Sequence, residues 1–236
     1  MTTSSSHTAL VTGASRGLGL ALAREIAQRG WKLIIDARGA EALAAARAEL
    51  APWTEVTAIA GDVADRSHRR ALVIAARAAG GIDALVNNAS LLGPSPQPQL
   101  MDYPIDTLER VYRANVFAPL ALIQAARHDL KPGARIVNVT SDAGVQAYPG
   151  WGGYGSSKAA LDQITAVLAQ EHPGLRVYAF DPGDMATELQ QQAFPGEDIG
   201  DRTPPERIVP ALMRLIDGDI PSGRYRAAEL AGSVAA

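Results

Sequence analysis

The stretch Thr8-Ala-Leu-Val-Thr-Gly-Ala-Ser-Arg-Gly-Leu-Gly19 decides the fold, because it has the pattern of a short buried strand, a glycine-rich turn and the start of a helix. Strand, glycine turn and helix is the order that a phosphate-binding loop requires, since a helix N-terminus attracts an anion. In such a loop Gly13 allows the tight turn, Gly17 lets the backbone approach a pyrophosphate, and Gly19 permits close packing of helix on strand. A turn of this kind also arises for structural reasons alone.

Strand and helix patterns alternate along nearly the whole chain. This alternation predicts right-handed crossovers and an α/β fold, a Rossmann-like, doubly wound parallel sheet flanked by helices. We expect strands at 8–12, 32–36, 56–60, 84–87, 135–140, 176–180 and near 225. We expect the further helices at 41–50, 65–79, 105–130 with a kink at Pro119, 154–170 and 205–215.

Length and composition favour a single globular domain over residues 1–236, with 47% hydrophobic and 20% charged residues. A net charge of −3 gives no reason to expect a nucleic-acid partner. There are no cysteines, and the four histidines are scattered without ligand spacing, so we expect no metal site. No run of about eighteen apolar residues is present to span a membrane.

Three segments depart from the strand and helix patterns. Residues 1–7 have the composition of a short polar tail and lack the pattern of a signal peptide, so we expect a cytoplasmic location. The proline-rich segment 91–104 is expected to be extended and exposed. Segment 187–203 is polar and contains proline and glycine, and it is either a lid over a site or a simple surface connection.

A second constellation combines Tyr154, Lys158 and Ser141. Positions i and i+4 share a helix face, so the Lys158 ammonium can lie close to the Tyr154 phenol. A fixed positive charge favours phenolate, and we therefore expect it to lower the pKa of the tyrosine from about 10 towards neutrality. A tyrosine tuned in this way exchanges protons readily. The alternative is an ordinary exposed helix pair.

Gly13, Asn88, Ser141 and Gly183 each follow an expected strand. In doubly wound sheets, ligands bind beyond the carboxyl ends of the strands. The sequence therefore predicts one site that combines the glycine loop with the Tyr/Lys pair.

With these motifs in order, the chain resembles the compact single-domain branch of the short-chain dehydrogenase/reductase family over about residues 8–225. The resemblance rests on six segments: TGASRGLG, Asp62-Val63, Asn87-Asn88-Ala89, Asn115, the set Ser141, Tyr154 and Lys158, and Pro182-Gly183 with Thr187. Ser90 stands where the family usually has glycine after Asn-Asn-Ala.

The resemblance implies hydride transfer between a nicotinamide cofactor and a carbonyl or secondary alcohol. It gives Tyr154 the role of general acid and base, Ser141 the substrate oxygen, and Asn115 a water that links Lys158 to solvent. It assigns to cofactor binding Gly13, Ser15, Arg16, Gly17, Leu18, Gly19, Arg38, Asp62, Val63, Asn88, Ala89, Tyr154, Lys158, Pro182, Gly183 and Thr187.

Several of these assignments have structural alternatives. Asn115 can be a buried amide that bonds to backbone, and Thr140 can take the role of Ser141. Asp62 and Thr187 can each cap a following helix. Tyr148 and Trp151 either line the substrate site or pack at an interface.

The preference between NADP and NAD depends on the end of the second strand. In the family an acid there selects NAD, and a basic residue just beyond it selects NADP. Aligning Lys32-Leu-Ile-Ile-Asp36-Ala37-Arg38 places Ala37 at the acid position and Arg38 at the basic one, with Arg16 as a second cation. Two guanidiniums suit a 2′-phosphate, so NADP is favoured and NAD is the alternative. A register slip of one residue would put Asp36 at the acid position.

The expected partner is a small carbonyl or alcohol substrate, which the sequence does not identify, and the family implies a homodimer or homotetramer. A non-catalytic NADP-sensing regulator on the same fold is the alternative function. An epimerase or dehydratase would need a larger carboxyl-terminal substrate domain, for which the chain has no room.

Overall fold

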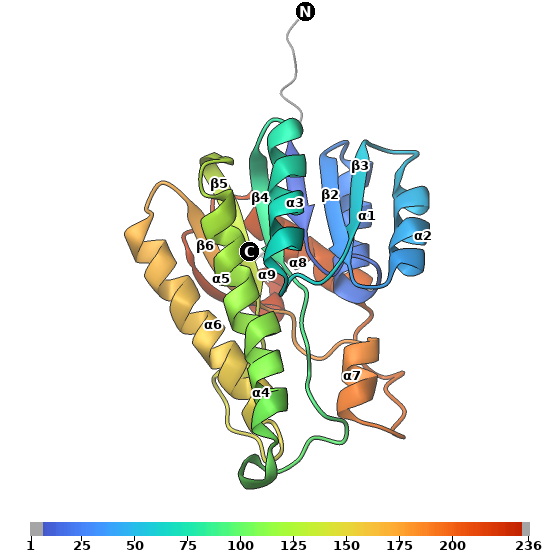
Figure 1. Ribbon diagram of the computed structural model, residues 1–236, viewed down its shortest axis with the longest axis vertical. Helices are drawn as coiled ribbons and strands as arrows, with labels where there is room; N and C mark the ends of the chain where they lie inside the picture. The colour runs from blue at the N-terminus through green and yellow to red at the C-terminus, as the bar shows by residue number, and fades with distance from the viewer. Residues whose placement is uncertain (1–6, 233–236) are drawn as a thin grey trace, which may run out of the picture.

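A computed structural model describes residues 7–232 and confirms the α/β class. Within these residues, seven strands form one parallel sheet in the order β3-β2-β1-β4-β5-β6-β7, with helices packed on both faces (Figure 1). The strands are β1 (Thr8–Val11), β2 (Lys32–Ala37), β3 (Val56–Ala60), β4 (Ile82–Asn87), β5 (Leu130–Val139), β6 (Arg176–Asp181) and β7 (Gly223–Arg226).

The helices follow the strands in the alternation that the sequence predicts. They are α1 (Gly17–Gln28), α2 (Ala40–Leu50), α3 (Arg66–Ala78), α4 (Ile105–Tyr112), α5 (Ala118–Ala126), α6 (Gly152–Glu171), α7 (Glu188–Ala193), α8 (Pro205–Asp217) and α9 (Ala227–Gly232). None of them, over the part of the chain described, is long and apolar enough to cross a bilayer.

The sheet is buried on both faces, which explains the continuous apolar strands. Leu33 and Ile35 pack with α1, α2 and α8 on one face, whereas Ile34 packs with α3 and α5 on the other. Successive side chains of a strand point to opposite faces, so both neighbours must be apolar when helices cover both.

The expected long helix over 105–130 is wrong in two respects. A π turn at Arg113–Phe117 separates α4 from α5, and α5 ends at Ala126. Pro119 is the second residue of α5 and follows the π turn directly, and prolines and π turns are both recognised causes of a helix kink. The strand that follows begins at Leu130, five residues earlier than expected, with a register shift against β4.

Two flanking segments are more ordered than their composition suggests. His7, expected in the polar tail, stacks on Trp31 with ring centroids 4.5 Å apart and pairs with Asp83 at 3.2 Å; residues 1–6 of that tail lie outside the described part. Segment 187–203 contains α7, and a bridge between Met185 and Thr203 closes its base.

A buried polar chain fixes α6 on the sheet. The Asn87 amide donates to Asn138 Oδ1 at 2.8 Å, and the Asn138 amide donates to Thr165 Oγ1 at 2.8 Å. All three residues are buried, so each bond replaces one that water would otherwise make. The carboxyl half of α6 is thereby held against β5, and its amino half projects past the strand ends.

Candidate active site

A cleft of about 970 Å³ opens at the carboxyl ends of the central strands. Gly13, Asn88, Ser141 and Gly183 all line it, as the strand ends predict. The other predicted site residues line it too, except Gly19 and Asn115. Over residues 7–232 no group of three or more histidine, aspartate or glutamate side chains is placed to hold a metal ion.

The glycine loop has the backbone that its sequence requires. Gly13 and Gly17 have φ values of +67° and +55°, a region that favours glycine. A Cβ on Gly19 would lie 2.4 Å from the Gly13 carbonyl oxygen, so Gly19 is a packing residue. Asn88 holds the loop, because its Nδ2 donates to Thr12 O at 2.9 Å and to Gly13 O at 3.1 Å.

Asp36 is buried, and both of its carboxylate oxygens have hydrogen-bond partners within the protein. Its Oδ1 accepts from Gly13 N at 2.8 Å, and its Oδ2 lies 2.9 Å from Nε2 of buried His68. Ala37 and Arg38 line the cleft beyond it, and Arg38 is exposed. Asp36 also lines the cleft, so its carboxylate lies at the cleft wall next to Ala37.

Arg16, the second cation predicted to bind a 2′-phosphate, is paired with a carboxylate of the protein itself. Its guanidinium pairs with Glu188 of α7 at 2.5 Å, and both side chains are exposed. Asp62 is exposed and accepts from Ala64 N at 2.8 Å, while the neighbouring Asp65 caps α3 by accepting from Ser67 N. The capping alternative for Asp62 is therefore wrong.

Tyr154 and Lys158 lie one turn apart at the amino end of α6, and both are buried. The Lys158 Nζ lies 5.3 Å from the centroid of the Tyr154 ring and donates to Val139 O at 2.8 Å. An exposed helix pair is thereby excluded. The two groups stand at the wall of the cleft, next to the end of β5.

The electrostatics of the pair differ from the expectation. Burial raises the pKa of Tyr154 above its ordinary value, a side-chain hydrogen bond with Ser90 opposes the rise, and the carboxylates of Asp181 and Asp142 add to it. Burial lowers the pKa of Lys158 to about 8, against the attraction of Asp162. Loss of water around both groups outweighs the effect of the lysine on the phenol.

Ser141 caps a short turn. Its Oγ donates to Asp142 Oδ1 at 3.0 Å and accepts from Ala143 N at 3.2 Å. The hydroxyl remains at the cleft wall, where it can exchange the carboxylate for another acceptor. Thr140, the alternative, is buried at 2% exposure, which favours Ser141 as the group that meets a ligand.

The Asn115 side chain is fully engaged outside the cleft. Its Oδ1 accepts from Leu91 N at 2.8 Å and Ser90 Oγ at 3.2 Å, and its Nδ2 donates to Leu91 O at 2.9 Å and Ser157 Oγ at 3.0 Å. These bonds match the structural alternative for Asn115, a buried amide that bonds to the backbone. Asn115 joins the loop after β4 to α6, and its π turn provides the local geometry.

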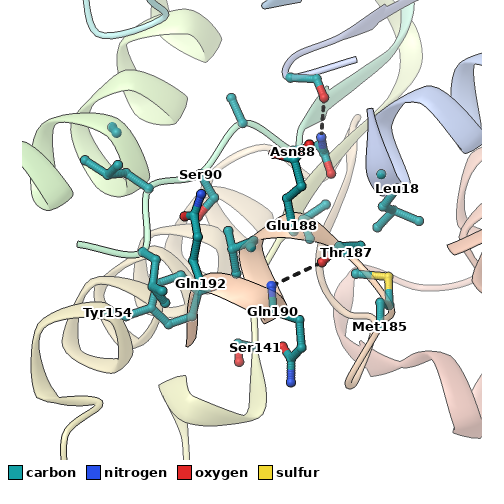
Figure 2. A pocket seen from close by; sticks show the side chains of 18 of the residues that line it. Leu18, Asn88, Ser90, Ser141, Tyr154, Met185, Thr187, Glu188, Gln190 and Gln192 are labelled. Atoms are coloured by element: carbon teal, nitrogen blue, oxygen red, sulfur yellow. Dashed lines mark hydrogen bonds between the residues drawn. The ribbon is translucent and has the colours of Figure 1, made fainter. Parts of the chain in front are cut away.

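Thr187 begins α7, and its Oγ1 accepts from Gln190 N at 3.4 Å, so it is a helix cap that also lines the cleft (Figure 2). Further residues line this part of the cleft without a signal in the sequence, among them Leu92, Met185, Leu189, Gln190, Gln192 and Phe194. Those in α7 belong to a six-residue polar helix, which has too little periodicity to reveal them.

Comparison with known proteins agrees with this geometry. Residues 7–198 match the family model described as short chain dehydrogenase. The chain is 37% identical over 207 residues to a short chain dehydrogenase of Penicillium thymicola, covering 81% of this chain and 75% of that protein. It is 35% identical over 195 residues to the rhamnolipids biosynthesis 3-oxoacyl-[acyl-carrier-protein] reductase of Pseudomonas aeruginosa, covering 77% and 73%. A solved short chain dehydrogenase from Shigella flexneri, complexed with NADP, has a TM-score of 0.87 at 28% identity, covering 94% of this chain and 97% of that one.

Because the Lys158 ammonium is buried, we expect Lys158→Met to stabilise the cofactor-free protein. A pKa lowered from 10.5 to about 8 means that the charge destabilises the folded state near neutral pH by roughly 3 kcal/mol, against about 1 kcal/mol from the lost hydrogen bond. We expect the variant to be more stable than the native chain by about 2 kcal/mol at about pH 7.

Between about pH 8 and 10.5 the lysine is protonated to a greater extent in the unfolded chain than in the folded chain. The free energy of unfolding of the native chain therefore increases as the pH rises through this range. The advantage of the variant should therefore shrink across this window, as measured by urea unfolding. Lys32→Met, at a half-exposed ion pair, is the control. A variant less stable than the native chain at neutral pH would contradict the assignment.

Proposed function

The chain belongs to the short-chain dehydrogenase family, and from this premise we propose that it is an oxidoreductase that transfers hydride between NADP(H) and a carbonyl or secondary alcohol. One observation carries the proposal: Tyr154 and Lys158 line the same cleft as the glycine loop and the loop after β4. A proton donor and a dinucleotide-binding loop thus share one solvent-accessible space.

The residues present fit a nicotinamide dinucleotide. The left-handed Gly13 and Gly17 leave backbone N–H groups at the start of α1, where an anion is favoured. Asp62, Val63, Pro182, Gly183 and Thr187 all line the cleft; in this proposal the first two would hold the adenine and the last three the nicotinamide end. When bound, the nicotinamide supplies or accepts the hydride.

The chain's own residues manage the proton. Tyr154 is neutral at physiological pH, since an ordinary tyrosine pKa lies near 10 and burial raises it further. Its hydroxyl is therefore available as a donor for the oxygen of a carbonyl undergoing reduction. Ser141 holds that oxygen by turning its hydroxyl away from Asp142. Lys158 lies one turn further along α6, and its pKa of about 8 lets it return a proton to the site near neutral pH.

NADP is the preferred cofactor in this proposal. The buried Asp36 carboxylate already has Gly13 N and His68 as partners, so it is not free to bind a ribose hydroxyl. Arg38 follows it at the cleft wall and is exposed, so it supports a charge-assisted bond to a 2′-phosphate. Arg16 can contribute only by leaving Glu188.

Segment 187–203 serves as the lid of the cleft. The ion pair of Arg16 and Glu188, both of which line the cleft, joins α7 to the glycine loop. Exposed ion pairs are weak, so this contact can open and close at little cost.

We predict that Tyr154→Phe lowers kcat by about 10²- to 10⁴-fold, because the general acid is lost. The affinity for NADPH, measured by fluorescence titration, should stay within about twofold of the native value, since the ring remains in place. Tyr112→Phe is the matched control on another helix. Unchanged turnover in Tyr154→Phe would contradict the general-acid role, and no turnover in the native protein despite intact NADPH binding would favour the regulator.

For cofactor choice, Arg38→Leu should weaken NADPH binding at least about tenfold, because a charge-assisted phosphate contact is lost. NADH has no 2′-phosphate, so its dissociation constant should not change. Arg127→Leu, at the far end of α5, is the control. Equal losses for both cofactors, or none for either, would count against the 2′-phosphate role.

We also propose that the protein is a homo-oligomer that associates through α4, α5 and the preceding turn. Ile105 at the start of α4 is 66% exposed, Phe117 in the π turn before α5 is 57% exposed, and Met101 before α4 is 99% exposed. Large exposed apolar side chains on consecutive elements support an association site there.

In light scattering after gel filtration, the native chain should have the mass of a dimer or tetramer, and Ile105→Glu with Phe117→Glu should reduce it. Ile74→Glu, equally exposed on α3, should not. A monomeric native protein would contradict this proposal.

A further inference from the structure

One part of the cleft has no role in the proposed transfer. Beyond Tyr154, the cleft continues between α7 and the segment that leads into α6. We define the aromatic subsite as Leu92, Trp151, Leu189, Gln190 and Phe194, all of which line the cleft. Leu92 packs with Tyr154 in one apolar cluster, and Trp151 and Leu189 pack against it, so the subsite borders the proton donor directly.

Aromatic rings form the walls of this subsite. The Trp151 ring lies edge-on to Tyr154 with centroids 5.9 Å apart, and it lies 5.9 Å from Phe194 at an interplanar angle of 48°. Both Trp151 and Phe194 remain partly exposed to the cleft. A planar apolar group that fills this space gains burial and ring contacts together.

Gln190 contributes an unpaired donor. Its side chain extends from α7 into the region of the cleft that Ser141 also lines (Figure 2). The residue is only 8% exposed, and its Nε2 has no hydrogen-bond partner among the described residues. A buried amide donor without an acceptor costs about 1–3 kcal/mol, so nearly all such groups have partners in native proteins. A ligand oxygen would supply the missing acceptor.

The charges around the subsite disfavour an anion. None of its five residues is basic. Asp142 lies at the adjoining wall, and its carboxylate accepts from Ser141 Oγ at 3.0 Å and from Tyr148 Oη at 2.9 Å. Arg202, whose guanidinium lies 5.6 Å from the Phe194 ring, is already paired with Asp184 at 2.9 Å. A carboxylate or phosphate beside Asp142 would meet a like charge. Two arginines also line the cleft: Arg113 lies 3.7 Å from Glu109, and Arg110 donates to Thr107 Oγ1 at 2.8 Å.

We propose that the substrate is an uncharged aryl ketone that carries a second oxygen beside the reacting carbonyl. The ring lies against Trp151 and Phe194, and the second oxygen accepts a hydrogen bond from Gln190 Nε2. This inference rests on the proposed reductase function. The carbonyl carbon accepts the hydride, its oxygen takes the proton of Tyr154, and NADPH is oxidised to NADP⁺.

Four compounds separate the parts of this inference. Methyl phenylglyoxylate has the ring, the second oxygen and no charge. Phenylglyoxylate adds a negative charge to the same skeleton, acetophenone lacks the second oxygen, and methyl pyruvate lacks the ring. With NADPH, kcat/KM should be highest for methyl phenylglyoxylate, by about tenfold or more over each of the others.

Two substitutions connect this order to the residues. Gln190→Leu should lower kcat/KM for methyl phenylglyoxylate by about tenfold and leave acetophenone nearly unchanged, since only the former uses the amide. Trp151→Ala should reduce turnover of the aryl compounds and spare methyl pyruvate. Gln28→Leu, at the exposed end of α1, is the control for the first change.

Binding of the same compounds to the NADP-loaded protein, followed by tryptophan quenching, should give the same order without turnover. If phenylglyoxylate or methyl pyruvate is preferred, and Tyr154→Phe abolishes its reduction, the substrate class is overturned while the reductase function stands. If the binding order holds but nothing is reduced, the subsite stands and the reductase function fails. Binding without preference overturns the inference.

Discussion

The buried ammonium of Lys158 is the interaction on which the site depends. Its hydrogen bond to Val139 O joins the first turns of α6 to the last residue of β5. Ser141 follows that strand end by two residues, and Tyr154 precedes the lysine by one helical turn. A single contact of a buried side chain therefore sets the distance between serine, tyrosine and lysine. The chain of Asn87, Asn138 and Thr165 secures the other end of the same helix.

Much of this arrangement is predictable because parallel sheets place all strand ends at one edge. Gly13, Asn88, Ser141 and Gly183 are recognisable from sequence as residues that follow apolar strands, and the structure brings them into one cleft. Strand alternation predicts that Asp36 and Ala37 point to opposite faces of the sheet, and the Asp36 carboxylate bonds to Gly13 N and His68. Periodicity supplies these facts directly, without knowledge of tertiary contacts.

The remainder depends on contacts that no pattern encodes. The π turn around Asn115 leaves the helical period almost intact, so the sequence predicts one continuous helix. The bonds from the Asn115 side chain to Leu91 and Ser157 leave no signal in the sequence. The pKa of Tyr154 was expected to fall because the motif reveals the neighbouring charge but not the burial that outweighs it. Helix α7 is too short and polar to be recognised, and with it the sequence analysis missed the Gln190 amide and the partner of Arg16.

Reductase chemistry at this edge of the sheet requires that the cleft hold a reduced nicotinamide dinucleotide beside Tyr154. The most direct test is energy transfer from protein tryptophan to NADPH and, separately, to NADH during titration of the native chain. Trp151 lies in edge contact with Tyr154, so a nicotinamide bound there should quench it strongly. The account predicts saturable quenching by NADPH, with NADH weaker by about tenfold or more. Absence of saturable quenching by either dinucleotide would contradict it.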